Sequence, residues 1–340
     1  MILVTGSRGS YNSTKAIIEG TGGRIGEIYL SISNSRFGSG RNYVHEVDMA
    51  ELMRQTAAAS QESIDISLAF NTVCFGMEKF QQKFIDEFIS LAKKIKNAGV
   101  KSIILSDPYL MKVVKENVTG LKVVVSVFAE TDTLNRLRYY NSLGVDRIII
   151  PHELNRNLRL LSDFVENSSC DLEVILNLGC SHYCVRGDTH SMFTGHYKGQ
   201  LRKQVLGDCY TTWCNSYKLN NPLDFLSQDW IRPEDVYRYE NMGIKYFKIA
   251  GRATATSWII NVANAYLNRS YEGNFFDLIS TYYPFVGRLP KKKAPFYVCN
   301  KDLDSVMEDL YDCGHLCDSC GSCKKIAQEL IDKGKLVLNQ

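Results

Sequence analysis

Short runs of apolar residues, rich in isoleucine and valine, alternate along the chain with longer segments in which apolar and polar positions repeat at helical spacing. The apolar runs predict strands at residues 2–5, 27–32, 65–70, 102–106, 123–127, 147–151, 173–178 and 246–250. The segments 49–60, 84–99 and 131–144 predict helices, and the last two end at glycine, as helix C-termini often do. Eight strands with intervening helices predict a TIM-like (β/α)8 barrel, for which a doubly wound open sheet is the competing arrangement.

The domain organisation follows from this pattern. A helix expected at residues 256–273 would close the barrel, so residues 1–285 form one TIM-like domain with a cysteine-rich insertion at residues 180–230, after the seventh strand. Residues 286–340 remain as a linker and a C-terminal cysteine-rich tail. The linker contains LPKKKAPFY, whose lysines and prolines are more typical of a solvated connector than of a nucleic-acid patch.

In a (β/α)8 barrel, the chemistry lies just past the C-terminal ends of the strands. Polar residues at those positions are therefore the candidate active-site residues, and for each of them the alternative is a helix cap or a structural hydrogen bond. Asp107, which precedes Pro108, also has the sequence of a helix N-terminus. The residues nominated in this way are Asn71, Asp107, Ser126, His152, Glu153, Asn177, Lys248 and Arg252.

Composition narrows the class of protein. Of the 340 residues, 45% are hydrophobic and 23% are charged, which is ordinary for a soluble globular protein. The formal net charge of +3 argues against a strongly basic nucleic-acid-binding body, although it is compatible with a local basic groove. The chain has no apolar run of about 18 residues that would span a membrane. It begins like a strand rather than a signal peptide, so we expect a cytoplasmic protein.

Eleven cysteines are many for such a chain, and eight of them lie in two clusters. In a long chain without a secretion signal, reduced thiols that bind metal are favoured over disulfides. The tail cluster has the spacing C-x3-C-x2-C-x2-C, which is a strong signal for a metal. Structural zinc usually takes two separated pairs, so the short continuous spacing favours a [4Fe–4S] cluster, with zinc as the alternative. The tail cluster consists of Cys313, Cys317, Cys320 and Cys323.

The insertion cluster is less regular, with the spacing C-x3-C-x24-C-x4-C. The loop between its halves carries polar residues, including Asp188 and His190, that can replace a thiolate ligand or contact a substrate. A simpler interpretation is that Cys209 or Cys214 is a small buried apolar residue. We nevertheless expect all four thiols to bind a metal or an iron–sulfur cofactor, which makes two expected [4Fe–4S] sites in the chain. The insertion cluster consists of Cys180, Cys184, Cys209 and Cys214.

Several motifs resemble those of one known family. FKIAGR at residues 247–252 is similar to the FKIEGR signature of the peptidase U32 (collagenase-like protease) family, and WIRPEDVYRYENMGIKYFKI matches the helix and strand that lead into it. Upstream, EIYLSISNSRFGSGR resembles the family's early strand and loop, with Phe37, Gly38 and Arg41 in place. SDPYL, SLGVDRIIIPHEL and EVILNLGC follow in the same order. The resemblance covers roughly residues 1–285, and this combination of motifs is specific.

The resemblance implies a TIM-like barrel and a [4Fe–4S] cluster held by the family's cysteines. For the members that hydroxylate, it implies oxygen addition to tRNA, rRNA or quinone precursors without dioxygen, whereas older usage calls the family peptidases. Two positions depart from the pattern. Val236 stands where the family has its usual fourth cysteine, so Cys209 or Cys214 would have to serve. Ala250 replaces the acidic residue of FKIEGR, which removes a carboxylate from the barrel mouth.

The expected function is therefore that of an iron–sulfur enzyme that modifies RNA or a small aromatic or quinone-type substrate. Lys248 and Arg252 would bind an anionic cosubstrate, and polar residues at other strand ends, namely Asn71, Asp107 and Glu153, would orient it. A peptidase is the alternative, although no Ser–His–Asp order or HExxH motif is visible. A third interpretation is a non-catalytic binding module that zinc stabilises. The loop at residues 35–43 is rich in glycine and arginine. It suggests a contact with RNA or with a partner subunit of a hetero- or homo-oligomer. The alternative is that the loop forms a lid over the barrel mouth.

Overall fold

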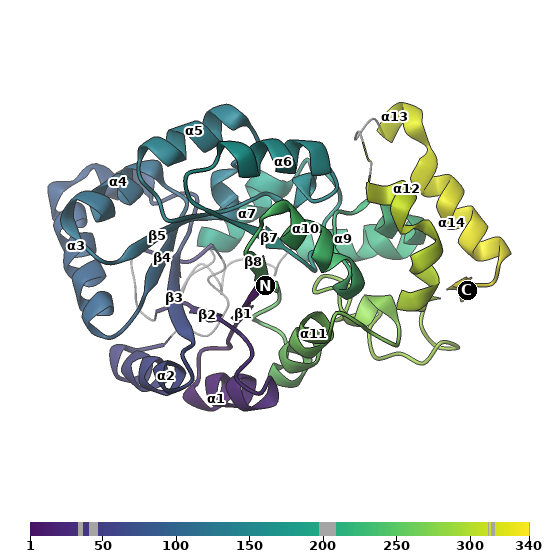
Figure 1. Cartoon of the computed structure of the whole chain (residues 1–340), viewed down its shortest axis with the longest axis horizontal. Coiled ribbons are helices and arrows are strands. Elements are labelled where there is room, and N and C mark those ends of the chain that lie inside the picture. Colours follow the sequence, from purple (N-terminus) through teal and green to yellow (C-terminus); the bar gives the residue numbers. More distant parts are fainter. Residues whose placement is uncertain (33–36, 41–46, 197–208, 312, 314–316, 340) are drawn as a thin grey trace.

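The computed structural model covers residues 1–340. It describes all of them except residues 33–36, 41–46, 197–208, 312, 314–316 and 340, and the side chains of His196, Cys209 and Asp318. Eight parallel strands close into a barrel in chain order, because β1 pairs with both β2 and β8 (Figure 1). This confirms the TIM-like barrel and all eight expected strands, although several of them end earlier than the apolar runs. The strands are β1 (Ile2–Gly6), β2 (Glu27–Leu30), β3 (Asp65–Phe70), β4 (Ser102–Leu105), β5 (Lys122–Val125), β6 (Arg147–Ile149), β7 (Asp171–Ile175) and β8 (Tyr246–Lys248).

Helices surround the barrel on the outside, and each connects one strand to the next (Figure 1). The principal ones are α1 (Tyr11–Gly20), α2 (Met49–Gln61), α3 (Gln82–Asn97), α4 (Pro108–Asn117), α5 (Leu134–Ser142), α6 (Leu158–Asn167), α10 (Val236–Met242) and α11 (Thr256–Asn268). Short 3-10 turns lie at η1 (Gly76–Phe80), η2 (Val127–Ala129), η3 (His152–Leu154), η5 (Pro233–Asp235) and η6 (Phe275–Asp277).

Local sequence explains where these helices begin and which face they bury. Asp48 caps α2 by accepting a hydrogen bond from Glu51 N at 2.8 Å, and Asn157 caps α6 in the same way. In α3 the buried residues recur every three or four positions, at Phe84, Phe88, Ala92 and Ile95 among others. That spacing forms one apolar stripe, which packs against the outside of the sheet.

Two apolar clusters make the core. The larger lies between the strands and the surrounding helices. The smaller fills the barrel interior with side chains from alternate strand positions, including Val4, Ala69, Ile104 and Ile149. Each fully buried aliphatic side chain of this kind contributes about 1.5–3 kcal/mol to folding. The barrel interior is therefore a packed core and not a channel.

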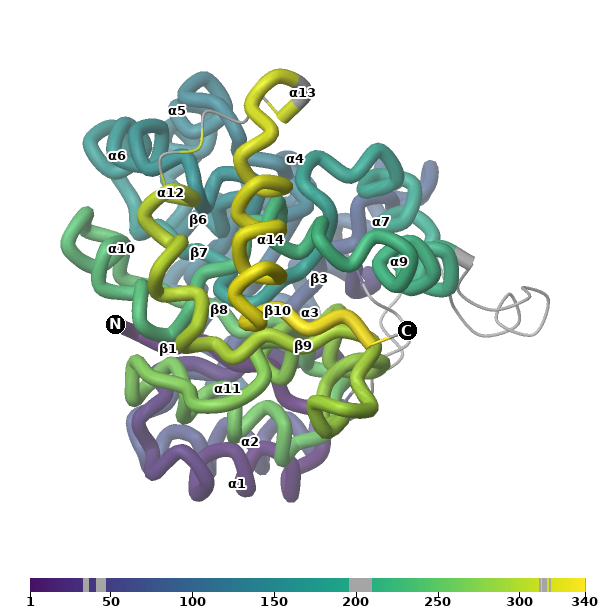
Figure 2. The backbone as a smooth tube through the Cα atoms, turned by 90° about the vertical axis from the view of Figure 1, so that its right-hand side faces the viewer, coloured from purple at the N-terminus to yellow at the C-terminus, as the bar shows by residue number. Residues whose placement is uncertain are grey.

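The insertion and the tail are both added at one side of the barrel. The insertion contains α7 (Gly187–His196), α9 (Cys209–Asn220) and η4 (Pro222–Ser227). The tail contains β9 (Phe296–Val298), η7 (Asn300–Val306), α12 (Met307–Tyr311), α13 (Cys317–Cys320), α14 (Ser322–Asp332) and β10 (Leu336–Leu338). Figure 2 shows α14 in front of the barrel, with the antiparallel pair β9–β10 beneath it. α14 packs on η4, so the tail is anchored to the insertion, and β9 begins inside the segment expected to be a linker.

None of the helices in the described part of the chain is long and apolar enough to cross a lipid bilayer.

Candidate functional site

Polar residues at the ends of β3, β4 and β5 form a hydrogen-bonded rim at the barrel mouth. The Asn71 side chain accepts a hydrogen bond from Gly40 N at 3.0 Å and donates one to Ser126 Oγ at 3.0 Å. Its backbone carbonyl accepts a third from Ser106 Oγ at 2.9 Å. Asn71 therefore lies at the mouth, as expected from the strand-end rule, and both ends of its amide are engaged in holding the rim together.

Asp107 begins α4 and also forms an ion pair. Its Oδ1 accepts hydrogen bonds from Tyr109 N at 2.9 Å and from Leu110 N at 3.2 Å, which is an N-cap arrangement. Its Oδ2 lies 2.5 Å from Lys79 Nζ. Both carboxylate oxygens are thus occupied within the protein, so the geometry matches the capping interpretation of this residue.

Glu153 lies at the end of β6, next to the cysteine-rich insertion. Its Oε2 is 3.1 Å from Nδ1 of His152, and the glutamate side chain is 20% exposed. Burial raises the pKa of Tyr183 of the insertion, and the charge of Glu153 raises it further. Glu153 is therefore the nominated carboxylate that the structure places beside the insertion.

Asn177 braces the ends of β7 and β8 and does not face a substrate. Its Oδ1 accepts a hydrogen bond from Ala250 N at 2.7 Å, and its Nδ2 donates one to the Leu278 carbonyl at 3.0 Å. The residue is fully buried. Its role in this structure is to hold three segments together.

Lys248 belongs to a group of four charged side chains inside the barrel, which we call the interior charge network: Glu27, Arg147, Glu173 and Lys248. Lys248 Nζ lies 3.2 Å from Glu173 Oε1, and Arg147 Nε lies 3.0 Å from Glu173 Oε2. Arg147 Nη2 donates hydrogen bonds to both Glu27 oxygens, at 2.7 and 2.8 Å. Two carboxylates and two cations from β2, β6, β7 and β8 therefore balance their charges in the interior.

Electrostatics within the interior charge network reflect this burial. Burial lowers the pKa of Lys248, while Glu173 and Glu27 act in the opposite direction. Burial alone would raise the pKa of Glu27, but the charge and hydrogen bonds of Arg147 outweigh it and the pKa is lowered. The Lys248 side chain is only 11% exposed. Lys248 is thus committed to the network more than to the barrel mouth.

Arg252 and Lys248 contact the same aromatic ring. Lys248 Nζ lies 4.1 Å from the Tyr29 ring centroid, and the Arg252 guanidinium lies 5.6 Å from it. Arg252 also donates a hydrogen bond to Ser39 Oγ at 2.6 Å. A Cβ at Gly6 would lie 2.3 Å from Arg252 Cβ, so only glycine permits this approach. Tyr29 therefore connects the interior charge network to the arginine past the end of β8.

The helix α7 of the insertion lies over the rim. Thr194 Oγ1 donates a hydrogen bond to the Gly40 carbonyl at 2.8 Å. Gly195 packs so closely on Thr72 that a Cβ there would be 2.6 Å from its hydroxyl oxygen. At the other end of the helix, burial and a hydrogen bond with Asp188 raise the pKa of Glu130, just past β5, to about 6. The insertion thus contacts strand ends on the opposite side of the barrel from its origin.

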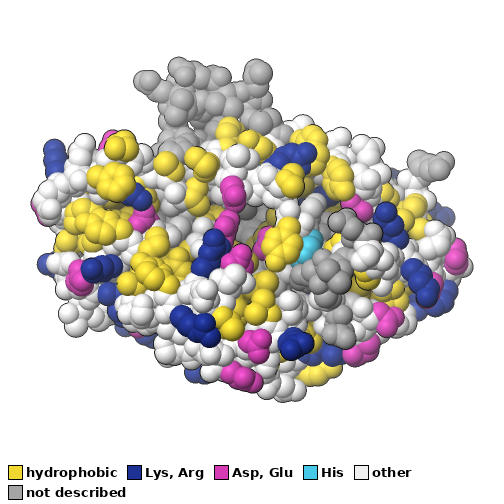
Figure 3. All heavy atoms as spheres, turned by 90° about the horizontal axis from the view of Figure 1, so that it is seen from above, with side chains coloured by type: hydrophobic (Ala, Val, Ile, Leu, Met, Phe, Trp, Pro, Cys, Tyr) yellow, Lys and Arg dark blue, Asp and Glu magenta, His cyan; other side chains and the backbone are white. Residues whose placement is uncertain are grey.

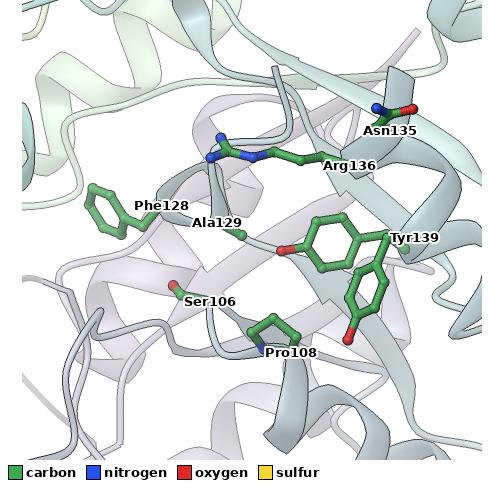
Figure 4. A pocket seen from close by; sticks show the side chains of 8 residues that line it. Ser106, Pro108, Phe128, Ala129, Asn135, Arg136 and Tyr139 are labelled. Carbon is green, nitrogen blue, oxygen red and sulfur yellow. The ribbon is translucent and has the colours of Figure 1, made fainter. Parts of the chain in front are cut away.

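A surface cavity of about 520 Å³ lies beside the rim, between the ends of β4 and β5 and the start of α5. Figure 4 shows Arg136 extending along one side of it, with Ser106 and Pro108 on the opposite side. Aromatic rings supply much of the remaining wall. The lining residues are Ser106, Pro108, Phe128, Ala129, Asn135, Arg136, Tyr139 and Tyr140.

The described part of the insertion contains three of its expected ligands. Cys180 lies just after β7, where the Gly179 carbonyl accepts a hydrogen bond from Thr281 Oγ1 at 2.8 Å. Cys184 follows one turn later, and Cys214 lies on α9. We call Cys180, Cys184 and Cys214 the insertion thiols. The side chain of Cys209 lies outside the described residues. None of the cysteines whose side chains are described forms a disulfide.

Lys218 is a buried lysine that interacts electrostatically with the insertion thiols. It lies one helical turn after Cys214 on α9 and is 1% exposed. Burial lowers the pKa of Lys218, and the charges that Cys180, Cys214 and Cys184 carry as thiolates oppose this shift. The ammonium group lies 4.4 Å from the Tyr282 ring centroid. Cys214 is close enough to accept a hydrogen bond from it as a thiolate.

This arrangement fits an anionic metal centre in its chemistry. In the described part of the chain, no three cysteine, histidine or carboxylate side chains are close enough in their present positions to hold a metal ion. However, thiols near a buried cation would suit a thiolate-bound cluster, because thiolate ligands make such a centre negatively charged. The insertion thiols and Lys218 would hold it and balance its charge.

Of the tail thiols, Cys317 and Cys320 lie on α13, Cys323 lies on α14, and Cys313 lies between α12 and α13. Cys317 and Cys320 are exposed, whereas Cys313 and Cys323 are partly buried. The loop at residues 35–43 was expected to contact RNA or a partner subunit. Arg41 of this loop lies in residues 41–46, which are outside the described part of the chain.

Several residues of the site were not nominated from the sequence. Glu27, Arg147 and Glu173 were visible as charged residues inside apolar strand runs, which is a signal for a buried network. Lys218 stands four positions after Cys214, so a helix places both on one face. Tyr282 has no such signal, because its position depends on how the segment after α11 packs against the insertion.

The fold and the rim define a TIM-like (β/α)8 barrel protein whose candidate site lies at the C-terminal ends of the strands. The model of peptidase family U32 matches residues 9–273, and the chain belongs to that family. It is 30% identical over 306 residues to the uncharacterized protease MJ1657 of Methanocaldococcus jannaschii, which covers 90% of this chain and 88% of the relative.

A solved structure supports the fold. The structure of the U32 peptidase Mk0906 is similar with a TM-score of 0.54 and 18% sequence identity, over 74% of this chain and 93% of the other. The family expected from FKIAGR and the upstream motifs is therefore confirmed.

Proposed function

We propose that this protein is an iron–sulfur enzyme that modifies a small aromatic or quinone-type substrate, or a nucleotide in RNA, by oxygen-independent hydroxylation. The insertion would hold a [4Fe–4S] cluster beside the barrel mouth, with Cys180, Cys184 and Cys214 as ligands and Cys209 as the fourth. When bound, such a cluster transfers electrons or, with an open coordination position, binds a substrate.

The observation that carries this proposal is the buried ammonium group of Lys218. Burying an unpaired ammonium costs several kcal/mol, so buried lysines normally have a carboxylate partner. The groups that act on Lys218 are instead thiols: as thiolates, Cys214 would accept a hydrogen bond from it, and Cys180 and Cys184 would act on it through their charges. Neutral thiols cannot compensate a positive charge, whereas thiolates bound to a cluster can. The site is therefore suited to a bound anionic centre.

The surroundings of the mouth favour a small substrate over RNA. The open cavity of about 520 Å³ beside the rim has aromatic walls, which suit a small aromatic molecule. Its arginine, Arg136, already pairs with Asp132 at 3.0 Å. Arg252 would bind an anionic group at the end of β8. Figure 3 shows acidic, basic and hydrophobic side chains of the described residues interspersed on one face around a central hollow. Among the described residues this mixture differs from the continuous basic surface typical of nucleic-acid binding.

The test is anaerobic purification of the full chain, followed by its visible spectrum and its iron and sulfide content. We expect a brown protein with broad absorption near about 400 nm. The double variant Cys180→Ser/Cys184→Ser should lose about four irons per chain. Lys218→Met should bind less iron, and Lys218→Arg, which keeps the charge, should bind more than Lys218→Met. Iron content that is the same in the cysteine variant and the unaltered chain would contradict the proposal.

A peptidase is the second candidate, favoured by one observation and by the name of the Methanocaldococcus relative. His182 Nδ1 lies 2.7 Å from Asp229 Oδ2, the Asp229 side chain is buried and that of His182 is 11% exposed, and the histidine stands between Cys180 and Cys184 in the sequence. A histidine oriented by a carboxylate supplies two of the three members of a nucleophilic triad, for which a neighbouring cysteine would be the nucleophile. Cleavage of denatured collagen by the metal-free protein, abolished in His182→Ala, would support proteolysis.

A further inference from the structure

Arg156 is a second buried cation whose donors are only partly used. It follows η3 and is 2% exposed. Its Nη1 donates a hydrogen bond to the Leu226 carbonyl, and its guanidinium lies 4.6 Å from the Trp230 ring centroid. Its Nε and Nη2 have no hydrogen-bond partner among the described residues. An arginine that is desolvated to this degree normally has a carboxylate or another anion against it.

The tail brings a thiol to the same point. Cys323 lies in the first turn of α14, and its Sγ donates to the Leu226 carbonyl at 3.6 Å. Arg156 and Cys323 therefore converge on one backbone oxygen of η4. Burial raises the pKa of Cys323 to about 11, and Arg156 is close enough to act against this rise. Residues far apart in the sequence thus meet where α14 packs on η4.

The other three tail thiols, Cys313, Cys317 and Cys320, lie close to Cys323 in the sequence. In the described part of the chain no three of these side chains are close enough to hold a metal ion in their present positions, so a bound cluster would draw them together. Gly321 has φ +63°, a left-handed conformation that turns the chain sharply between α13 and α14. Cys317 and Cys320 lie before this turn and Cys323 lies after it. Cys317 and Cys320 remain exposed, so the group is accessible from solvent.

We propose that Cys313, Cys317, Cys320 and Cys323 hold a second iron–sulfur cluster, of the [4Fe–4S] type, for which Arg156 of the barrel domain is the buried counter-ion. Arg156 is a positioning residue in this proposal, because it acts on the cluster through charge and through its unused N–H groups. The second centre stands independently of the insertion thiols and of the hydroxylation proposed above.

Two features favour a cluster over zinc at this position. The four thiols fall within eleven residues without the long spacer that separates the ligand pairs of most zinc sites. A positive charge placed against sulfur ligands is also a means by which proteins adjust the reduction potential of a cluster. Zinc has no redox chemistry for Arg156 to adjust.

The first experiment compares metal content in the full chain after anaerobic reconstitution with iron and sulfide. Cys317→Ser/Cys320→Ser alters exposed residues and should leave the fold intact. It should remove about four irons per chain while the insertion site keeps its own. Cys180→Ser/Cys184→Ser should remove a separate set of about four irons per chain. The variant that combines all four substitutions should hold almost no iron. Cys170→Ser is the matched control and should lose no iron.

The second experiment tests Arg156 by redox titration, followed by electron paramagnetic resonance of the reduced protein. Removing a positive charge disfavours the reduced, more negative cluster. Arg156→Met should therefore lower the midpoint potential of the signal that disappears in Cys317→Ser/Cys320→Ser. Arg156→Lys should lower it less, and the other signal should not move.

Two results would overturn the second cluster. One is unchanged iron in Cys317→Ser/Cys320→Ser, and the other is loss of one zinc per chain from that variant with iron unaffected. If the midpoint potential is the same in Arg156→Met and in the unaltered protein, Arg156 is not the counter-ion of the cluster. If iron is lost only from Cys180→Ser/Cys184→Ser, the tail proposal fails while the proposed function stands.

Discussion

Replacing Lys248 with methionine removes one of the two cations from the interior charge network and leaves its two carboxylates in place. Glu173 is fully buried and is held by Lys248 at 3.2 Å and by Arg147 at 3.0 Å. After the replacement, Arg147 alone faces Glu173 and Glu27. The barrel interior then contains one uncompensated negative charge, while methionine fills much of the volume of the lost side chain.

The size of the effect follows from this geometry. Breaking a buried ion pair by removing one partner costs about 3–5 kcal/mol. Because Arg147 still pairs with Glu173, we expect the lower end, about 3 kcal/mol, out of a total stability on the order of 5–15 kcal/mol. Protonation of a carboxylate relieves the excess charge. The loss should therefore be smaller at pH 5 than at pH 8.

Urea unfolding at both pH values measures this loss, with Lys248→Met/Glu173→Gln as the control. The double variant restores charge balance, with Arg147 and Glu27 remaining as a pair. It should be more stable at pH 8 than Lys248→Met, even though it carries an additional substitution. A loss below about 1 kcal/mol in Lys248→Met that does not change with pH would refute the network. So would a double variant less stable than the single one.

Two further predictions concern the rim. Because the pKa of Glu130 is raised from 4.5 to about 6 by burial and by Asp188, the folded state binds more protons than the unfolded state in that window. The contribution of Glu130 to stability should thus fall as pH rises from 4.5 to 6, and Glu130→Gln should flatten this part of the Tm profile; an unchanged slope would contradict it. Asp107→Ala should cost about 1–2 kcal/mol in urea unfolding, since it loses a helix cap and the Lys79 ion pair. Asp107→Asn keeps the cap and should cost less; equal losses would show that the cap contributes little.

The barrel was predictable from the sequence because its strands are buried on both faces. Runs such as SIIL of β4 and KVVV of β5 are almost continuously apolar, and their spacing leaves room for one helix between successive strands. The count of eight then selects a closed barrel. Strand ends were less well predicted, because apolar residues such as Ile150, Leu176 and Ile249 continue past the ends of β6, β7 and β8.

The roles of the strand-end residues were harder to predict. Asp107 and Asn177 lie where the barrel rule places active-site residues, yet one caps a helix and the other braces two strands. Sequence does not separate these roles, since a carboxylate or amide at a strand end serves both. Lys248 was nominated for the mouth, but only the inward register of β8 shows that it faces Glu173. No pattern in the sequence pointed to Arg156, because its role depends on where the tail packs against the barrel domain.

The partners of other buried cations in this protein can be compared with the surroundings of Lys218 and Arg156. Arg147 and Lys248 have carboxylates in the barrel, and Arg232 has Asp235 at 2.7 Å. The chain thus supplies carboxylates to these three buried cations. Near Lys218 and Arg156 it has cysteines instead, whose thiolate forms would interact with the two cations. In the two proposed clusters, the bound thiolates would supply the negative charge that carboxylates supply in the barrel, because a bound metal keeps closely spaced thiols deprotonated at neutral pH.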